Sequence, residues 1–211
     1  MCNLYLLRTA AEEVGRLFGA EPDRGANVAE EMVPGYPGLV VTDGRVRAMT
    51  WGFPLVLKGR QGQPLKPKAV TNAREDKLGT AFWRDSFAQR RCLIPMTQWA
   101  EAEGARGRMT RTWYGLEGRE TFAVAGLWRP TAEWGAAYAM VMADSCPQML
   151  DVHDRMPVIL APEHHARWLE RDAGDAFALC RACDLALTVE RSREVWAGGA
   201  WPAQEEAPRL L

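Results

Sequence analysis

The sequence predicts an α+β protein built mainly from antiparallel strands, and three observations support this prediction. Nine Trp and thirteen Pro stand against only three His in 211 residues, a composition that favours strands and turns over a helical bundle. Short apolar runs are separated by Gly, Pro, Asn and Asp, which are the residues that turns use. No alternation of strand and helix patterns indicates a doubly wound parallel sheet. The length suits one domain with a sizeable core.

The strands are expected where apolar runs lie between turn residues. The clearest local signal is a hairpin, because the apolar runs at residues 39–41 and 46–49 flank Asp43-Gly44. The pair Asn72 and Arg74 lies at the end of another apolar stretch. Further strands are expected at residues 3–7, 92–95, 112–116, 121–127, 137–143 and 185–189.

The first helix is expected just after the first strand. Thr9-Ala-Ala-Glu12 has the spacing of a capping box, and Val14, Leu17 and Phe18 would share one helical face. Gly19 would end this helix. Other helices are expected at residues 80–89, 162–171 and 175–182, and loops at residues 25–37 and 58–68.

Charge is distributed unevenly along the chain. The net charge is −1, so gross charge predicts neither nucleic-acid nor acidic-membrane affinity. Residues 58–91 nevertheless contain nine basic and three acidic residues, a local balance of +6. Such a segment fits either a phosphate-binding face or a solvated surface.

The cysteines favour a reduced, cytoplasmic protein. Their number is five, which is odd, and neither a secretory signal nor a membrane span is evident. Cys180 and Cys183 have the spacing of a metal knuckle, but a matching second pair is missing, so structural cysteines in a helix are the better interpretation. We therefore expect no metal and no cofactor. GxSxG, HExxH, Walker and Rossmann patterns are also absent.

Cys2 follows the initiator methionine, and this position gives it chemistry that an internal cysteine lacks. Removal of Met1 would leave an α-amine and a thiol on adjacent carbons. Both titrate at about pH 8, so both are partly deprotonated near neutral pH. Such an aminothiol suits an aldehyde, because the amine forms a Schiff base and the thiol closes a thiazolidine ring on the same carbon. The alternative is an incidental cysteine before the fold.

Three more polar residues lie within apolar or turn-forming segments: Asn72, Glu101 and His153. Each has an ordinary interpretation, as a turn residue, a solvated glutamate and a hydrogen-bonded histidine. With Cys2 they supply a nucleophile, a carboxylate, an imidazole and an orienting amide, which a covalent site needs.

These segments, taken in order, resemble the SRAP family of SOS-response-associated peptidases. The resemblance runs from residue 1 to about residue 190, and no single motif decides it. The matching residues are Met1-Cys2, Trp51-Gly52, Asn72-Ala73-Arg74, Arg91 to Pro95 followed by Glu101, Ala125 to Trp128, and His153 to Pro157 with the apolar run after it.

The resemblance implies a barrel-like core with flanking helices, over a domain of residues 1–195 with a flexible tail at 196–211. It implies a sensor of abasic sites in single-stranded DNA, acting in the DNA damage (SOS) response through a covalent crosslink at Cys2. Asn72 would hold the cysteine and the opened sugar, Glu101 would handle the α-amine, and His153 would donate and accept protons. The residues implied or expected to bind DNA are Arg74, Trp51, Lys68 and Lys77.

The chain departs from the usual family pattern in three places. Asn3-Leu4 replaces Gly-Arg, Glu75-Asp76 replaces Ser-Glu after the Asn-Ala-Arg segment, and Ala100 and Ala102 flank Glu101 where aromatic residues are typical. A basic residue is thus lost near the cysteine and an acid is gained near the expected phosphate track, so altered DNA affinity is expected.

Two other functions stay open from the sequence. One is a thiol peptidase acting on peptides in trans with Cys2 and His153; the other is a non-covalent module for single-stranded DNA. Met1 would be removed by autoproteolysis or by an aminopeptidase. We expect association with the nucleoid when DNA is bound, and nothing in the sequence indicates a membrane or an obligatory protein partner.

Overall fold

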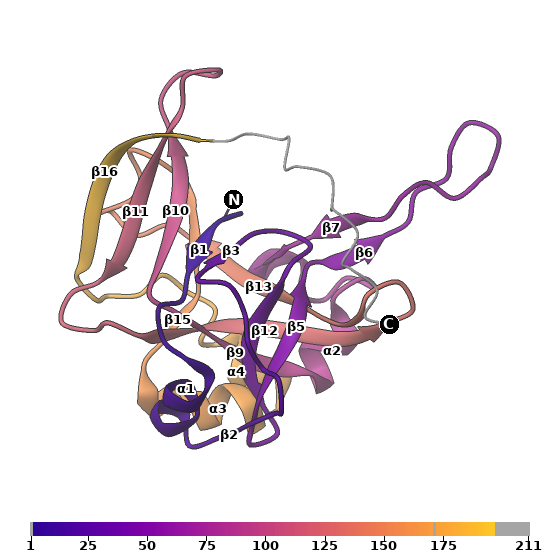
Figure 1. The fold of residues 1–211 in the computed structure, drawn as a ribbon, viewed down its shortest axis with the longest axis horizontal. Coiled ribbons are helices and arrows are strands. Elements are labelled where there is room, and N and C mark those ends of the chain that lie inside the picture. Colours follow the sequence, from indigo (N-terminus) through magenta and orange to yellow (C-terminus); the bar gives the residue numbers. More distant parts are fainter. Residues whose placement is uncertain (1, 171, 197–211) are drawn as a thin grey trace, which may run out of the picture.

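The computed structural model describes residues 2–170 and 172–196. Two β-sheets enclose a shared core, and short helices gather at one end of the molecule (Figure 1). None of the helices in the described part of the chain has the length and apolar stretch that a membrane crossing needs. The helices are α1 (Ala11–Phe18), α2 (Arg84–Gln89), α3 (His165–Glu170) and α4 (Ala173–Phe177), with 3-10 turns η1 (Glu75–Lys77) and η2 (Pro162–His164).

The smaller sheet has five strands, and every neighbouring pair in it is antiparallel. It joins the start of the chain to segments about a hundred and two hundred residues away. Its strands, in spatial order, are β16 (Leu187–Val195), β11 (Thr110–Leu116), β10 (Gln98–Glu103), β1 (Tyr5–Leu6) and β3 (Glu31–Met32).

The larger sheet is mostly antiparallel, with parallel pairing of β13 to β5, β13 to β8 and β2 to β5. The expected mainly antiparallel α+β architecture, barrel-like and flanked by helices, is therefore confirmed. The main path is β14 (Arg155–Pro157), β13 (Gly135–Asp144), β12 (Phe122–Thr131), β9 (Arg91–Met96), β4 (Pro37–Thr42), β5 (Arg45–Trp51) and β2 (Glu21–Pro22). Strands β15 (Ile159–Leu160) and β8 (Asn72–Arg74) join it at β12 and β13, while β6 (Phe53–Leu55) and β7 (Lys68–Val70) form a separate hairpin that projects from the body in Figure 1.

The predicted hairpin forms as expected. Strands β4 and β5 pair with Val41 opposite Val46, and Asp43 and Gly44 have φ angles of 52° and 67°. Both turn residues are therefore left-handed, as a two-residue type I′ turn requires, and Gly adopts this conformation without a Cβ penalty.

Buried aromatic residues join the two sheets. The hydroxyls of Tyr5 in β1 and Tyr138 in β13 are 2.5 Å apart, and the ring of Trp51 stacks on Tyr138 and meets Tyr5 edge-on. Gly38 in β4 permits this arrangement, since a Cβ there would come within 2.1 Å of the Tyr138 hydroxyl oxygen. The first strand of the chain is thus fixed against the centre of the larger sheet, which positions the residues next to it.

The predicted capping box at the first helix is wrong. The N-cap of α1 is Ala10, whose side chain makes no cap, and the Thr9 hydroxyl instead pairs with the hydroxyl of Thr121. Gly19 ends the helix with a φ of 63°, as predicted. Leu17 is 54% exposed, so the apolar face of this helix is narrower than its sequence pattern predicts.

Other element boundaries differ from those expected. The helix expected at residues 80–89 begins only at Arg84, and α4 ends at Phe177, so Cys180 and Cys183 follow a helix rather than lie in one. Strand β10 is not predicted by the sequence. Strand β16 ends at Val195, and the amide of Trp196, the first residue of the expected tail, donates to the Met109 carbonyl oxygen at 2.8 Å. The rest of the expected tail, residues 197–211, lies outside the described residues.

Candidate active site around Cys2

Cys2 lies inside the fold, immediately before β1. Its relative exposure is 0%, and its thiol contacts the Leu4 carbonyl oxygen at 3.6 Å. Burial, followed by the negative charge of Glu101, raises the pKa of the thiol. The cysteine is thus held as a protonated thiol inside the fold, and nearby groups must accept its proton during any reaction at sulfur.

Asn72, the first residue of β8, holds the cysteine through its side-chain amide. Its Nδ2 donates to the Cys2 carbonyl oxygen at 2.8 Å and to the Thr71 hydroxyl at 2.8 Å. The Thr71 hydroxyl in turn donates to the Asn3 side-chain oxygen at 3.1 Å. Both hydrogens of the amide are therefore used to place the start of the chain, which fixes the orientation of Asn72.

The carbonyl oxygen of the Asn72 side chain is buried and points away from the groups that its amide nitrogen contacts. Within residues 2–170 and 172–196, no hydrogen-bond partner is found for its buried Oδ1. A buried acceptor without a donor carries a free-energy penalty of about 1–3 kcal/mol. An amine or hydroxyl that reaches Cys2 would remove this penalty by donating to Asn72.

Glu101 comes from the opposite sheet, in the middle of β10. It lies across from Thr112 of β11, and the neighbouring Ala100 amide donates to the Leu4 carbonyl at 3.0 Å, which brings β10 alongside the start of the chain. The Glu101 side chain is only 2% exposed. Burial raises its pKa from 4.5 to about 7. Such a carboxyl group can exchange a proton near neutral pH and, once ionised, strongly favours a cation beside it.

The raised pKa of Glu101 gives a testable dependence of stability on pH. The folded state binds this proton more tightly than the unfolded state, so the stabilisation is complete below about pH 4.5 and is lost as the pH rises through about 7. We expect the wild-type chain to lose on the order of 2–3 kcal/mol over this range from this group. Glu101→Gln should remove that decline in urea unfolding experiments at pH 5 and pH 8.

Glu103 on the same strand provides the matched control. A hydrogen bond from Thr112, opposed by desolvation and aided by Arg191, lowers the pKa of Glu103, so its contribution to stability has the opposite sign. Glu103→Gln should therefore keep the decline that Glu101 causes. Parallel pH profiles for the wild type and Glu101→Gln would contradict this assignment of the titrating group.

His153 lies in the loop between β13 and β14, with its side chain 22% exposed. The Arg155 amide is 2.9 Å from His153 Nδ1 and donates to it. In a neutral ring this bond leaves the proton on Nε2. Burial lowers the pKa of His153 below 6.5, which favours the neutral ring. His153 Nδ1 also lies 3.1 Å from the Arg155 carbonyl oxygen, so Nε2 carries the proton in the tautomer whose Nδ1 accepts the bond from the Arg155 amide.

One hydrogen bond and the influence of nearby charges link the four candidates within the described residues. The Asn72 amide touches Cys2, and the Glu101 charge acts on the Cys2 thiol. The Asp154 carboxylate influences the pKa values of both Glu101 and His153: it adds to the effect of burial on Glu101 and opposes the larger effect of burial on His153. It lies 3.3 Å from His153 Nδ1. Residues 2, 72, 101 and 153 thus belong to one region, although they come from both sheets and from a loop.

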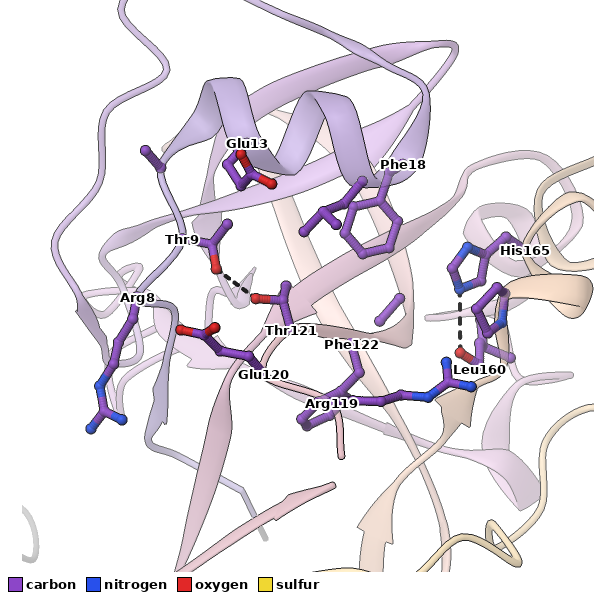
Figure 2. Close-up of a pocket in the computed structure, with 14 residues that line it drawn as sticks. Arg8, Thr9, Glu13, Phe18, Arg119, Glu120, Thr121, Phe122, Leu160 and His165 are labelled. Atoms are coloured by element: carbon purple, nitrogen blue, oxygen red, sulfur yellow. Dashed lines mark hydrogen bonds between the residues drawn. The ribbon is translucent and has the colours of Figure 1, made fainter. Parts of the chain in front are cut away.

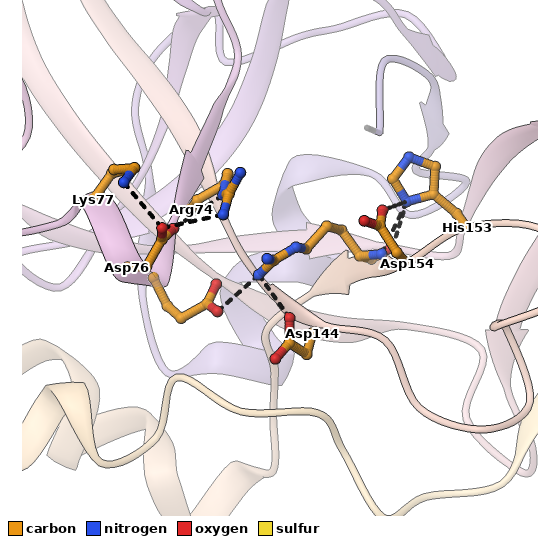
Figure 3. A network of polar contacts seen from close by, with 8 residues as sticks. Arg74, Asp76, Lys77, Asp144, His153 and Asp154 are labelled. Carbon is orange, nitrogen blue, oxygen red and sulfur yellow. Dashed lines mark hydrogen bonds and ion pairs between the residues drawn. The ribbon is translucent and has the colours of Figure 1, made fainter.

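Arg74, Lys77 and Lys68 lie on the segments on either side of Asn72. Arg74 is two residues beyond Asn72 on β8, so both side chains leave the strand on the same face. Figure 3 shows Arg74 and Lys77 converging on Asp76. The distances from Asp76 are 2.9 Å to Arg74 Nε and 3.1 Å to Lys77 Nζ. Lys68 is an exposed residue of β7. All three cations are therefore at or near the surface beside the site.

Trp51 is placed differently from the expectation. Its relative exposure is 0%, so its ring presents no face on which DNA could stack. Its indole nitrogen donates to the Thr71 carbonyl oxygen at 3.3 Å, next to the hydroxyl that holds Asn72 and Asn3. Trp51 thus packs in the core behind the site and does not lie on a surface that could bind DNA.

Sequence reasoning missed the residues that secure the candidates. Thr71 links Asn72 to Asn3, and no spacing pattern marks it. Arg155 pairs with Glu75 and Asp144, each at 2.8 Å. This cluster ties the end of β8 to β13 and β14, and thereby ties Asn72 to the loop of His153. Arg155 lies in the His153 to Pro157 segment of the family resemblance, so the resemblance could have pointed to it.

A pocket elsewhere in the fold does not include any of the four candidates. Its volume is about 640 Å³, and it lies between α1, the start of β12 and α3 (Figure 2). Phe18 stacks on His165 inside it, at 5.4 Å between ring centroids.

In the two described ranges, no group of three or more His, Cys, Asp or Glu side chains is arranged to hold a metal ion. Cys180 and Cys183 are both free thiols.

Solved structures with the same fold exist. A protein from Bordetella bronchiseptica aligns with a TM-score of 0.75 at 22% identity, covering 90% of this chain and 99% of that one. A protein from Bacteroides thetaiotaomicron aligns with a TM-score of 0.74 at 17% identity, covering 89% and 91%. At these identities the comparison shows the fold alone.

Relatives in sequence carry informative names. The chain is 26% identical over 184 residues to the abasic site processing protein YoqW of Bacillus subtilis, covering 80% of each chain. It is 27% identical over 183 residues to the abasic site processing protein YoaM of the same organism, covering 80% of this chain and 79% of the relative.

The family model described as SOS response associated peptidase matches residues 1–192, nearly the whole of the described chain. The segments that suggested this resemblance include those that carry Cys2, Asn72, Glu101 and His153. The chain belongs to the SOS response associated peptidase (SRAP) family.

Proposed function

We propose that this protein reacts with abasic sites in single-stranded DNA and forms a covalent thiazolidine through Cys2 once Met1 has been removed. The observation that supports this most directly is the position of Cys2, whose carbonyl is held by the Asn72 amide while its thiol lies in the field of Glu101. The relatives named abasic site processing proteins supply the substrate class.

The proposed reaction uses both functional groups of the terminal cysteine. The α-amine nitrogen attacks the aldehyde carbon of the opened sugar, and loss of one water gives an iminium. The Cys2 sulfur then bonds to the same carbon, its proton leaves to a base, and the iminium electrons return to nitrogen. The product is a five-membered ring, and the only by-product is water.

Glu101 suits two steps of this sequence. A carboxyl group with a pKa of about 7 can take a proton from the attacking amine or from the thiol near neutral pH. Its ionised form also stabilises the iminium cation, and this attraction is strong because the group is buried. Asn72 contributes through Oδ1, which can accept a hydrogen bond from the amine or from a sugar hydroxyl.

His153 suits the opening of the sugar. An abasic sugar exists mainly as a closed hemiacetal, so a proton must reach the ring oxygen and another must leave the hydroxyl before the aldehyde appears. With Nδ1 accepting from Arg155, the Nε2–H of His153 is the donor that we assign to the ring oxygen. We assign Arg74, Lys77 and Lys68 to the DNA phosphates.

The family description as a peptidase fits this proposal through the chain's own first residue. Cleavage between Met1 and Cys2, by the protein itself or by an aminopeptidase, produces the reactive aminothiol. We further propose that the protein acts in the cytoplasm during DNA damage (SOS) responses, needs no obligatory protein partner, and joins the nucleoid when it is bound to DNA.

The function is tested by changing only the aldehyde of the DNA. A single strand in which one uracil has been excised should give a protein–DNA band that survives heating in detergent. The same strand, treated with borohydride to reduce its aldehyde to an alcohol, should give none, and neither should the intact strand. Equal bands from the abasic and reduced strands would contradict the proposed chemistry.

The word peptidase also supports a second candidate, hydrolysis of peptides in trans by Cys2 and His153. The buried thiol with its raised pKa is a poor nucleophile for a peptide that arrives from solution. Turnover of a peptide library by the wild type, lost in Cys2→Ala, would favour this candidate.

A further inference from the structure

The cations nearest the site are engaged by the chain's own carboxylates. Arg74 donates two parallel hydrogen bonds to Asp76, from Nε to Oδ1 at 2.9 Å and from Nη2 to Oδ2 at 3.1 Å. Lys77 adds a third contact, Nζ to Oδ2 at 3.1 Å. This fork on a two-oxygen anion is the arrangement by which Arg binds phosphate.

The fork stands close to the proposed reaction centre. Arg74 is at the end of β8, the three-residue strand that begins with Asn72, and its side chain leaves the same face. A single strand whose abasic sugar reaches Cys2 would therefore carry a phosphate past Arg74. Asp76 occupies the partner position that this phosphate would take.

Two carboxylates follow Arg74, and they differ in how easily they can be displaced. Glu75 pairs with Arg155 where both side chains are only 17% exposed, and separating that pair would leave charges partly buried. Asp76, Arg74 and Lys77 are 40%, 44% and 56% exposed. Pairs this exposed stabilise a protein by about 0–1 kcal/mol, so a phosphate can replace Asp76 while Glu75 stays in place.

We propose that Asp76 competes with the DNA phosphates for Arg74 and Lys77. Asp76 stays paired with these two cations until a strand is held in the site by its reaction with Cys2. This inference rests on the proposed function and concerns its selectivity. Intact strands must displace Asp76 and gain little, so they leave quickly. An abasic strand is retained by the covalent bond, so the same penalty does not release it. Asp76 thus reduces occupancy of the site by undamaged DNA.

The test compares two substitutions that remove the same charge. Asp76→Asn frees Arg74 and Lys77. Asp85→Asn is the charge-matched control, because Asp85 pairs at 3.2 Å with its neighbour Arg84 in α2, where the two side chains are 68% and 65% exposed. Binding of an intact fluorescent single strand is measured by anisotropy over a salt series. Crosslinking of an abasic strand is measured separately, with and without excess intact strand as competitor.

Asp76→Asn should lower the Kd for the intact strand by about two- to five-fold, the value of one exposed ion pair. Its plot of log Kd against log salt should steepen by about 0.7 for one additional phosphate contact. Asp85→Asn should change the Kd and the salt slope by less than half of these amounts. In the competition assay, intact strand should slow crosslinking by Asp76→Asn more than crosslinking by the wild type. When Arg74 is already replaced by alanine, adding Asp76→Asn should raise the affinity for the intact strand clearly less than the same substitution does in the wild type.

Equal effects of Asp76→Asn and Asp85→Asn would overturn the inference, because the loss of one negative charge anywhere nearby would then explain the gain in affinity. An unchanged gain in the Arg74→Ala background would overturn it as well. Neither result bears on the chemistry at Cys2, which the wild-type crosslink reports. If the wild type forms no crosslink while the binding data follow the expected pattern, the proposed function fails and only a non-covalent role of Asp76 remains.

Discussion

Replacing Cys2 with alanine should abolish the heat-stable adduct with abasic single-stranded DNA, while binding of intact strands stays within about two-fold. The thiol is the group that closes the ring, and without it the reaction stops at a Schiff base that water reverses. The side chain removed is small. Denaturing gels over a time course measure the adduct, and anisotropy measures binding.

The serine variant sharpens this expectation. Cys2→Ser keeps the α-amine and nearly the same shape but replaces the sulfur with a far weaker nucleophile. Borohydride should trap the Schiff base of Cys2→Ser and of Cys2→Ala, whereas neither variant should give a stable adduct without the reductant. A stable adduct in Cys2→Ala without reductant would remove Cys2 from the role assigned to it.

His153→Ala should slow crosslinking by about a hundred-fold or more, since positioned proton transfer contributes roughly 10²–10⁴-fold. The side chain is 22% exposed and its Nδ1 contacts the backbone of the nearby Arg155, so the fold should survive. Single-turnover crosslinking rates at saturating protein measure the loss, and the melting temperature reports the fold.

Two further variants separate chemistry from structure at this position. His153→Gln, which can present an amide N–H near the position of Nε2, should recover part of the lost rate. His164→Ala, at the end of η2, removes a histidine outside the site and should leave the rate unchanged. A wild-type rate for His153→Ala would show that another group opens the sugar.

The local features of the fold are readable from the sequence because they depend on neighbouring residues. Asp43-Gly44 gives its hairpin since both residues tolerate a positive φ. The same reasoning fails at Thr9, whose hydroxyl is used by Thr121 from a distant strand rather than by its own helix. It also fails for β10, because the Ala and Glu residues around Glu101 have low strand propensity and pair only because β1 and β11 lie on either side.

The site is predictable in its residues but not in its contacts. The order of the family segments selects Cys2, Asn72, Glu101 and His153, and the fold gathers them through pairings between β1 and β10 and between β8 and β13. Local patterns carry no information about which strands pair. Long-range packing also decides that Trp51 is buried.

The central claim is that a liberated aminothiol at Cys2 condenses with the aldehyde of abasic DNA. Intact-mass spectrometry of the protein, with and without an abasic oligonucleotide, followed by peptide mapping of the adduct, tests it most directly. We predict a protein mass lacking one methionine residue, a complex equal to protein plus DNA less one water, and attachment at Cys2. An adduct that retains Met1, maps to a lysine, or does not form would contradict the claim.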